Sequence, residues 1–406
     1  MSGRAACAAA VALVLAGCAA PRPAEKEIVF FPPVPELPRI QYLTSFSGAK
    51  GFEEESSFRR FIVGAEAPRQ LDKPYGVAIA AGRIYVCDTN QTVYVFDLKR
   101  RTFEPLAGAE GQGKLIQPIN ISIAEDGTKY VTDTVRGQVV VFGSDDAYLR
   151  AFGRPEEWKP VDAVPVGDRL YVADIAHAKV HILDRKSGER LGTLGDEGEP
   201  SARLNRPTNL AIDREGTLYV SDAGRFQVVK YDRKGAYVGS VGKVGNNLGH
   251  FARPKGISLD RDGRLYAVDA SFNNVQVFSR EGRLLLFFGK GGPGAGEFLL
   301  PAEVVVDYDH VPLFQEYVQP YFEVEYLILV TSQLGERLVS VFGFGKEKGK
   351  AYPSDEALFE RIKERIRQQL PQEGQADAPG SESPLEGVSP KLPEGGAEPA
   401  GVPPAR

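Results

Sequence analysis

Apolar and polar residues alternate in short runs from about residue 73 to residue 343, and the runs recur in a fixed order. An apolar run that ends in aspartate occurs five times, at Asp88, Asp133, Asp174, Asp222 and Asp269. A sixth copy, LILVT, ends at Thr331. A proline and another short run precede each copy, and a second alternating run follows it. Because alternation with a period of two is typical of half-buried strands, each copy predicts several β-strands.

The length of the repeat predicts the fold. Four short strands recurring about every 40 to 50 residues are typical of a β-propeller, in which each repeat forms one blade. The six copies therefore predict an all-β, six-bladed propeller over residues 40–350. The 44 glycines and 29 prolines agree with a chain of many short strands and turns.

The sixth repeat lacks its outer strand. Its third strand, LVSVFG at Leu338–Gly343, runs into a charged, glycine-rich segment. The stretch IQYLTSFSG at Ile40–Gly48 has the missing pattern, although it precedes the first repeat. We expect this N-terminal strand to pair with the third strand of the last blade and close the ring, because an open ring would leave an unpaired edge.

The repeats resemble those of the NHL family. The segment RPKGISLDRDGRLYAVDASFNNVQVFSREGRLLLFFG at Arg253–Gly289 carries this resemblance most clearly, and the resemblance extends over Ile40–Gly343. It implies a six-bladed propeller in which the five repeated aspartates brace turns by accepting backbone hydrogen bonds, so we expect a structural role for them.

The N-terminus predicts export and a lipid anchor. Residues 1–17 have one cation, Arg4, and then an apolar stretch that is typical of a signal peptide. The following LAGC, which ends at Cys18, resembles the lipobox of bacterial lipoproteins and implies lipidation of Cys18. Ala19 then favours the outer membrane, facing the periplasm or the cell surface. An ordinary signal peptide is the alternative. Residues 18–39 are proline-rich and predict an extended tether.

The C-terminus and the composition narrow the picture further. Residues 351–370 predict a helix with Ser354 as its N-cap, and residues 371–406 have few large apolar side chains and predict a disordered tail. A net charge of −5 without a long basic run argues against nucleic-acid binding. With Cys7 in the signal peptide and Cys18 lipidated, Cys87 has no cysteine partner for a disulfide.

The third residue of each proline motif should face the central channel. These residues are Gly76, Asn120, Asp162, Asn209, Gly256 and Glu303. Two carboxylates and two carboxamides supply the oxygen ligands that calcium takes. Six-bladed calcium-dependent lactonases are similar in this respect, so the alternative function is a metal-dependent hydrolase or lyase that uses Asn120, Asp162, Asn209 and Glu303. The other residues of the lactonase motifs are not reproduced, and no histidine is placed to act as a base.

Two sets of surface residues are candidates for an interface with a partner. The turns after the repeated aspartates should gather Arg136, His177, Lys179, Arg225, Phe226 and Phe272 on one face. An insertion in the sixth repeat, Asp307–Tyr326, adds Phe314, Tyr317, Tyr321 and Phe322. Aromatic and arginine side chains are common anchors of interfaces, although a solvated rim is the alternative. His181, by alternation on its strand, should face outward.

These observations favour a non-catalytic, monomeric envelope lipoprotein whose propeller binds a protein or a cell-envelope polymer and serves as a scaffold. The insertion also resembles that of NHL lipoproteins associated with multihaem cytochrome systems, which implies a cytochrome as the partner. Neither function requires a cofactor, apart from calcium in the hydrolase alternative.

Overall fold

A computed structural model describes residues 27–33, 35–53, 69–90 and 92–369. The signal peptide at 1–17, Cys18 and the tail at 371–406 lie outside these residues, so the predictions made for them are not tested by the structure.

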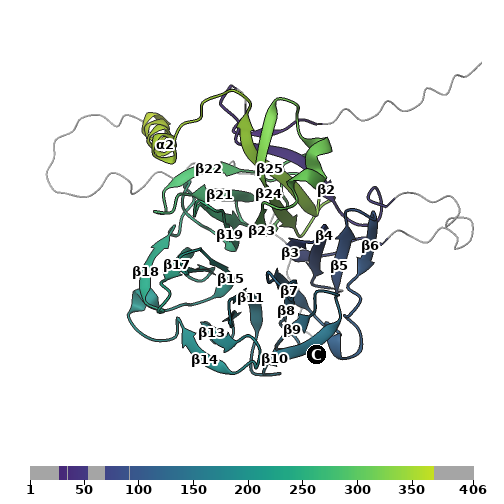
Figure 1. Cartoon of the computed structure of the whole chain (residues 1–406). Helices are drawn as coiled ribbons and strands as arrows, with labels where there is room; N and C mark the ends of the chain where they lie inside the picture. Colours follow the sequence, from purple (N-terminus) through teal and green to yellow (C-terminus); the bar gives the residue numbers. More distant parts are fainter. Residues whose placement is uncertain (1–26, 34, 54–68, 91, 370–406) are drawn as a thin grey trace, which may run out of the picture.

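Six antiparallel sheets surround a common axis, and each sheet is one blade (Figure 1). The six-bladed propeller predicted from the repeats is therefore confirmed. Blade 1 consists of β3 (Pro74–Ala80), β4 (Arg83–Asp88), β5 (Val93–Asp97) and β6 (Thr102–Pro105). Blade 2 consists of β7 (Pro118–Ile123), β8 (Lys129–Asp133), β9 (Gln138–Phe142) and β10 (Tyr148–Gly153). Blade 3 consists of β11 (Pro160–Val166), β12 (Arg169–Asp174), β13 (Lys179–Asp184) and β14 (Arg190–Leu194).

The second half of the ring follows the same order. Blade 4 consists of β15 (Pro207–Ile212), β16 (Leu218–Asp222), β17 (Gln227–Tyr231) and β18 (Tyr237–Val241). Blade 5 consists of β19 (Pro254–Leu259), β20 (Leu265–Asp269), β21 (Asn274–Phe278) and β22 (Leu284–Phe288). Blade 6 contains β23 (Pro301–Asp307), β24 (Phe322–Ser332) and β25 (Val339–Glu347). Two short 3₁₀ turns, η1 (Gly111–Gly113) and η2 (Pro200–Ala202), lie in connections between blades.

The first strand of every blade lines the axis, and neighbouring first strands contact one another around the ring. We call the end of the propeller at which these inner strands begin the entry face. Because the strands are antiparallel, the turns between second and third strands also lie at the entry face, and the turns between first and second strands lie at the opposite face. Each inner strand has a register shift just after its proline, as a β-bulge produces, and a bulge changes the direction of the side chains beside it.

The N-terminal strand closes the ring as predicted. Strand β2 (Ile40–Phe46) pairs with β25, with Ile40 opposite Phe344 and Phe46 opposite Val339. A short strand, β1 (Phe30–Phe31), pairs in turn with β2 and becomes the fifth strand of blade 6. Part of the segment expected to be an extended tether is thus docked along the outer edge of this blade. The prolines that follow β1 are tolerated there, because proline is compatible with an edge strand.

Each repeated aspartate braces its own blade, as the resemblance to NHL repeats implied. All five carboxylates are fully buried. In blade 4, Asp222 accepts hydrogen bonds from the backbone N–H groups of Asn205 and Arg206, which precede the inner strand β15. It also accepts those of Gly224 and Arg225, which follow the second strand β16. The carboxylate thereby ties the two entry-face connections of the blade together.

The insertion in blade 6 contributes to the core. It contains the 3₁₀ helix η3 (Val311–Tyr317) and leads into β24. Phe314 is buried beside Phe46 in the cluster between blades 6 and 1, and Phe322 packs edge-on against Phe30, with 5.2 Å between ring centroids. This corrects the expectation that Phe314 and Phe322 lie at an interface, because both side chains fill the space left beside the lengthened blade.

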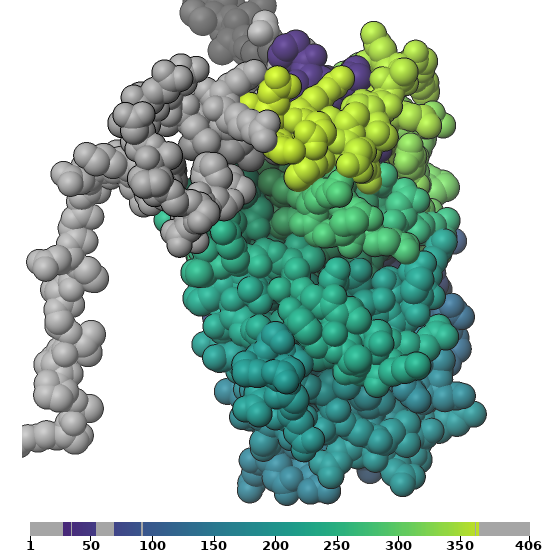
Figure 2. Space-filling model, turned by 90° about the vertical axis from the view of Figure 1, so that its left-hand side faces the viewer, coloured from purple at the N-terminus to yellow at the C-terminus, as the bar shows by residue number. Residues whose placement is uncertain are grey.

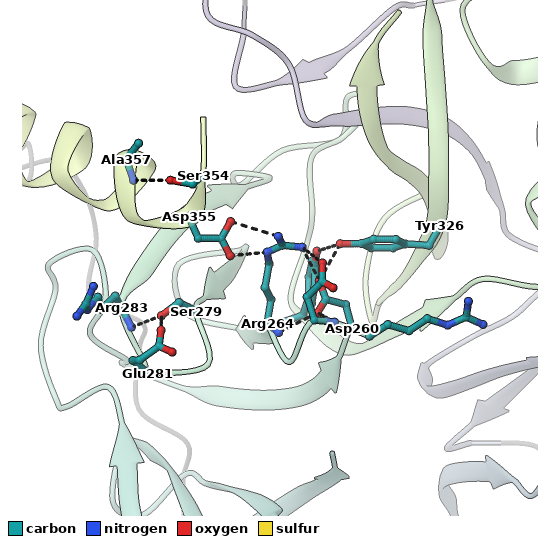
Figure 3. A network of polar contacts seen from close by, with 12 residues as sticks. Asp260, Arg264, Ser279, Glu281, Arg283, Tyr326, Ser354, Asp355 and Ala357 are labelled. Carbon is teal, nitrogen blue, oxygen red and sulfur yellow. Dashed lines mark hydrogen bonds and ion pairs between the residues drawn. The ribbon is translucent and has the colours of Figure 1, made fainter. Parts of the chain in front are cut away.

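Helix α2 (Asp355–Gln369) follows the propeller, and Ser354 Oγ accepts a hydrogen bond from the N–H of Ala357, as an N-cap does. Figure 3 shows how the helix is attached: Arg264 Nε donates to Asp355 Oδ2 at 2.8 Å, and its Nη1 contacts Asp260 at 3.1 Å. Arg283 forms a second ion pair with Glu356. In Figure 2 the yellow C-terminal residues lie against the green blades beside the purple N-terminal residues. The helix therefore packs on blade 5 through ion pairs.

Candidate functional site

The inner strands bring their third residues together on the axis, as the repeat pattern predicted. Asn120 comes from β7, Asp162 from β11, Asn209 from β15 and Glu303 from β23, and all four side chains are buried. They form a polar layer that crosses the central channel.

Glu303 is the centre of this layer. Its Oε2 accepts hydrogen bonds from Asn120 Nδ2 at 2.8 Å and from Asn209 Nδ2 at 2.6 Å. These donors belong to blades 2 and 4, so one carboxylate of blade 6 links three blades across the channel. Its Oε1 accepts the backbone N–H of Val304 at 3.0 Å.

Asp162 is held by backbone groups of two blades. Its Oδ1 accepts the N–H of Ala163 at 2.8 Å, and its Oδ2 accepts the N–H of Leu210 in blade 4 at 2.7 Å. Desolvation by burial nevertheless raises the pKa of Asp162 to about 7, and these hydrogen bonds oppose the rise. The pKa of Glu303 is also raised, first by burial and then by the charge of Asp162. Protonation of the pair is favoured because two negative charges close together in a buried layer are costly.

Glycine in the two blades beside blade 6 leaves room for the Glu303 layer. A Cβ at Gly256 would lie 2.4 Å from Glu303 Oε1 and 2.5 Å from Glu303 Cα. A Cβ at Gly76 would lie 2.1 Å from Asn120 Oδ1. A side chain at either position would therefore displace the layer.

The raised pKa of Asp162 predicts a pH-dependent stability. Between pH of about 4 and about 7 the folded state binds more protons than the unfolded state, because the pKa of Asp162 rises from 3.8 to about 7 on folding. This contribution to the free energy of unfolding is present below pH of about 4 and is lost as the pH rises through about 7. The Asp162→Asn variant lacks it, so its stability relative to the native protein should increase by up to about 4 kcal/mol between pH 4 and 8.

Urea unfolding across this pH range measures the difference. The exposed Asp309→Asn variant, at the opposite face, serves as the control. A difference between Asp162→Asn and the native protein that stays constant, or falls as the pH rises, would contradict the assignment.

The polar layer fits calcium poorly. A calcium site needs several oxygen atoms directed at one point. Here both amide N–H₂ groups point at Glu303, and Asn120 Oδ1 accepts the N–H of Ile121. Asn209 Oδ1 is the one oxygen of these four side chains that is buried without a hydrogen-bond partner. Among the described residues, no group of three or more His, Cys, Asp or Glu side chains is arranged to hold a metal ion.

The structure divides the expected interface residues between opposite faces. Those that follow the repeated aspartates lie at the entry face, where His177 is exposed and Arg136, Lys179, Arg225, Phe226 and Phe272 are half-buried. The insertion belongs to a turn between first and second strands, so it lies toward the opposite face. There Tyr321 is exposed and Tyr317 is partly buried. The two sets do not form one surface.

The expectation that His181 faces outward is wrong. Its ring is buried and stacks on Trp158 with 4.0 Å between centroids, and its Nε2 contacts Asp174 Oδ2 at 3.1 Å. Burial would raise the pKa of Asp174, but the hydrogen bonds with His181 and His177 lower it to about 2. Both histidines therefore contact Asp174, the carboxylate that braces the turns of blade 3.

Five exposed apolar side chains lie in the connections of the entry face. Ile116, Val135, Val244, Leu248 and Leu334 are between 44% and 63% exposed. Leu334 also borders a shallow depression between blades 6 and 1, lined by Gln70, Leu71, Asp72, Gln333, Gly335 and Leu338. Arg136, Arg225, Phe226 and Phe272 lie on the same face, and arginine and aromatic side chains are enriched in interfaces, so this face is the better candidate for an interface.

Sequence reasoning missed a set of basic residues on the entry face. Lys73, Lys159, Arg206 and Arg253 each stand directly before the proline of an inner strand, and all four are exposed. The signal was present in the repeat, since four of the six copies have a cation at this position. It becomes informative only when the inner strands are placed around one axis.

The fold and the channel define the class of the protein as a six-bladed β-propeller. No family model matches the chain. Its fold is similar to that of a structural genomics protein of unknown function from Bacteroides thetaiotaomicron, with 15% identity, a TM-score of 0.51 and coverage of 74% of this chain and 75% of that one. An auxiliary nutrient binding protein from the same organism has 12% identity, a TM-score of 0.50 and coverage of 68% and 70%.

A gluconolactonase from Xanthomonas campestris has 16% identity, a TM-score of 0.49 and coverage of 77% of this chain and 99% of that one. At these identities the similarity concerns the fold alone and does not transfer an activity. In the part of the chain that the structure describes, no helix combines the length and apolar character that crossing a membrane requires.

Proposed function

We propose that this protein is a non-catalytic, lipid-anchored envelope scaffold that binds another protein through its entry face. The exposed apolar side chains in the connections of that face carry the proposal. Arg206 and Arg253 are exposed on the same face, and arginine is enriched in protein interfaces.

The anchor rests on Cys18 and on the route of the chain after it. Phe30 and Phe31 pair with the outer edge of blade 6, so the described part of the chain begins beside this edge. We therefore propose that the protein is held at the outer membrane by lipid and that the entry face is left open to a partner. A multihaem cytochrome is the partner that the resemblance of the sequence implies.

A metal-dependent hydrolase or lyase is the second candidate. The observation that favours it is the unpartnered Asn209 Oδ1 in a layer with two carboxyl groups. If this chemistry operates, Asn209, Asp162 and Glu303 would hold the metal, which would polarise a substrate oxygen. The direction of the two amide groups toward Glu303 argues against it.

The double variant Asp162→Asn/Glu303→Gln separates the two candidates. The scaffold proposal predicts an unchanged metal content in the purified protein, and unchanged recovery of bound proteins from native membranes. Elemental analysis by mass spectrometry, with the exposed Asp309→Asn/Glu323→Gln variant as the control, measures the metal. A stoichiometric metal in the native protein that is lost only in the channel variant would overturn the scaffold proposal.

A further inference from the structure

Five basic side chains surround the start of the central channel. Lys73, Lys159, Arg206 and Arg253 precede β3, β11, β15 and β19, and they are exposed at the entry face. The fifth, Lys255, stands two residues after Arg253 within β19 and is only 8% exposed. A buried lysine without a counter-charge is rare in proteins.

Lys255 reaches across blade 6 toward blade 1. Its Nζ lies 4.5 Å from the centroid of the Tyr75 ring, and Tyr75 is the second residue of β3. Blade 6 has only Ala302 at the equivalent position, which leaves space for the lysine stem. The ammonium group is thereby held at the axis over an aromatic face, which favours a cation.

We call the exposed side chains of Lys73, Lys159, Arg206 and Arg253 the rim cations. Three of them act on the ammonium group of Lys255. Burial, together with the charges of Arg253, Lys73 and Arg206, lowers the pKa of Lys255 to about 7, against the opposing effect of Glu303. Three rim cations from blades 1, 4 and 5 are therefore within electrostatic reach of one ammonium group, and they repel its charge.

Carboxylates do not neutralise this cluster. In residues 27–369, as far as the structure describes them, none of the five basic side chains forms an ion pair. The nearby braces Asp88, Asp174, Asp222 and Asp269 are fully buried, and they accept the backbone N–H groups of the four rim cations themselves. The braces thus fix the backbone that carries each cation and leave its side chain free to bind.

We call the entry-face end of the central channel its mouth. The carboxyl groups of the polar layer, further along the inner strands, already accept hydrogen bonds. Glu303 takes two amide groups and a backbone N–H, and Asp162 takes two backbone N–H groups. The polar layer stands one position further along the inner strands than Lys255, so a ligand that approaches from the entry face would meet the cations before these carboxyl groups.

We infer that the mouth of the channel binds a compact polyanion, a free small molecule that carries several phosphate or carboxylate groups, with Arg253 and Lys255 at the centre of the site. Arginine pairs with both groups through two parallel hydrogen bonds, and lysine adds a point charge. An anion would relieve the mutual repulsion of the cations, and would supply the counter-charge that Lys255 lacks. This site does not depend on the proposed protein partner.

Calorimetric titration of the full-length protein with inorganic pyrophosphate and with citrate tests the inference. The native protein should bind at least one of them saturably, and the affinity should fall as salt is raised. The Arg253→Gln/Lys255→Gln variant should bind at least tenfold more weakly. The control, Arg214→Gln/Lys234→Gln, removes one exposed arginine and one exposed lysine from blade 4 at the opposite face, and should bind within about twofold of the native protein.

Because Lys255 is buried, its substitution could unfold the protein, so the exposed Arg206→Gln variant is measured as well and should also bind more weakly. If neither probe binds saturably, the inference is wrong. It is also wrong if Arg253→Gln/Lys255→Gln and Arg214→Gln/Lys234→Gln lose affinity to the same extent. Binding of an acidic octapeptide in the absence of any binding of the small probes would overturn it too, since the occupant would then be a segment of a protein.

Discussion

Deletion of the closing strand, Ile40–Gly48, should abolish the folded propeller. Strand β2 buries Ile40, Tyr42, Leu43 and Phe46 and covers the free edge of β25. Burial of four large side chains contributes about 6 to 12 kcal/mol, which is comparable to the whole net stability of about 5 to 15 kcal/mol of a typical domain. We expect circular dichroism to show no cooperative unfolding transition in the deletion variant.

One substitution in β2 and one in the chain before it provide a graded test. Ile40 is fully buried, so Ile40→Ala should lower the free energy of unfolding by about 2 to 5 kcal/mol. Ile28, also near the N-terminus, is 54% exposed, and Ile28→Ala should change it by less than about 0.5 kcal/mol. A deletion variant that unfolds cooperatively at the same midpoint temperature as the native protein would refute the role of β2.

Substitution of the channel glycine Gly76 by alanine should also destabilise the propeller. The added Cβ would lie 2.1 Å from Asn120 Oδ1, 2.5 Å from Asn120 Cα and 2.8 Å from the carbonyl oxygen of Ile119. Because two of these atoms belong to the backbone of β7, relief requires the inner strands of blades 1 and 2 to separate. We expect a loss of about 3 kcal/mol in the free energy of unfolding.

Gly192 in β14 is the matched control, because a Cβ there would meet nothing within 4 Å. Gly192→Ala should leave the stability unchanged or raise it slightly. Chemical unfolding of both variants measures the difference. Equal stabilities of Gly76→Ala and Gly192→Ala would show that the inner strands are not packed as tightly as the structure indicates.

The repeats predicted the architecture because each blade encodes the same local pattern. The five aspartates occupy one position in that pattern, so the role of Asp222 as a turn brace could be expected from the sequence. The missing outer strand of blade 6 likewise identified Ile40–Gly48 as the closing strand. The closing strand followed from the order of elements along the chain, whereas the brace role followed from the resemblance of the repeats to NHL repeats.

Contacts across the ring could not be predicted in the same way. The hydrogen bonds of Glu303 with Asn120 and Asn209 depend on the length of one side chain and on glycine in the neighbouring blades. The burial of Phe314 depends on how the insertion folds back on blade 1. Alternation placed His181 outward, because it did not register that Trp158 covers that side of β13.

The entry face, and not the opposite face, should contact the partner protein. A photo-crosslinking amino acid placed at Val135 or Leu334 in the full-length, lipid-anchored protein tests it in native cells, with Val166 at the opposite face as the control. All three positions are exposed. We expect a protein adduct of defined mass from at least one entry-face position and none from Val166. Adducts from Val166 alone, or equal adducts from both faces, would contradict it.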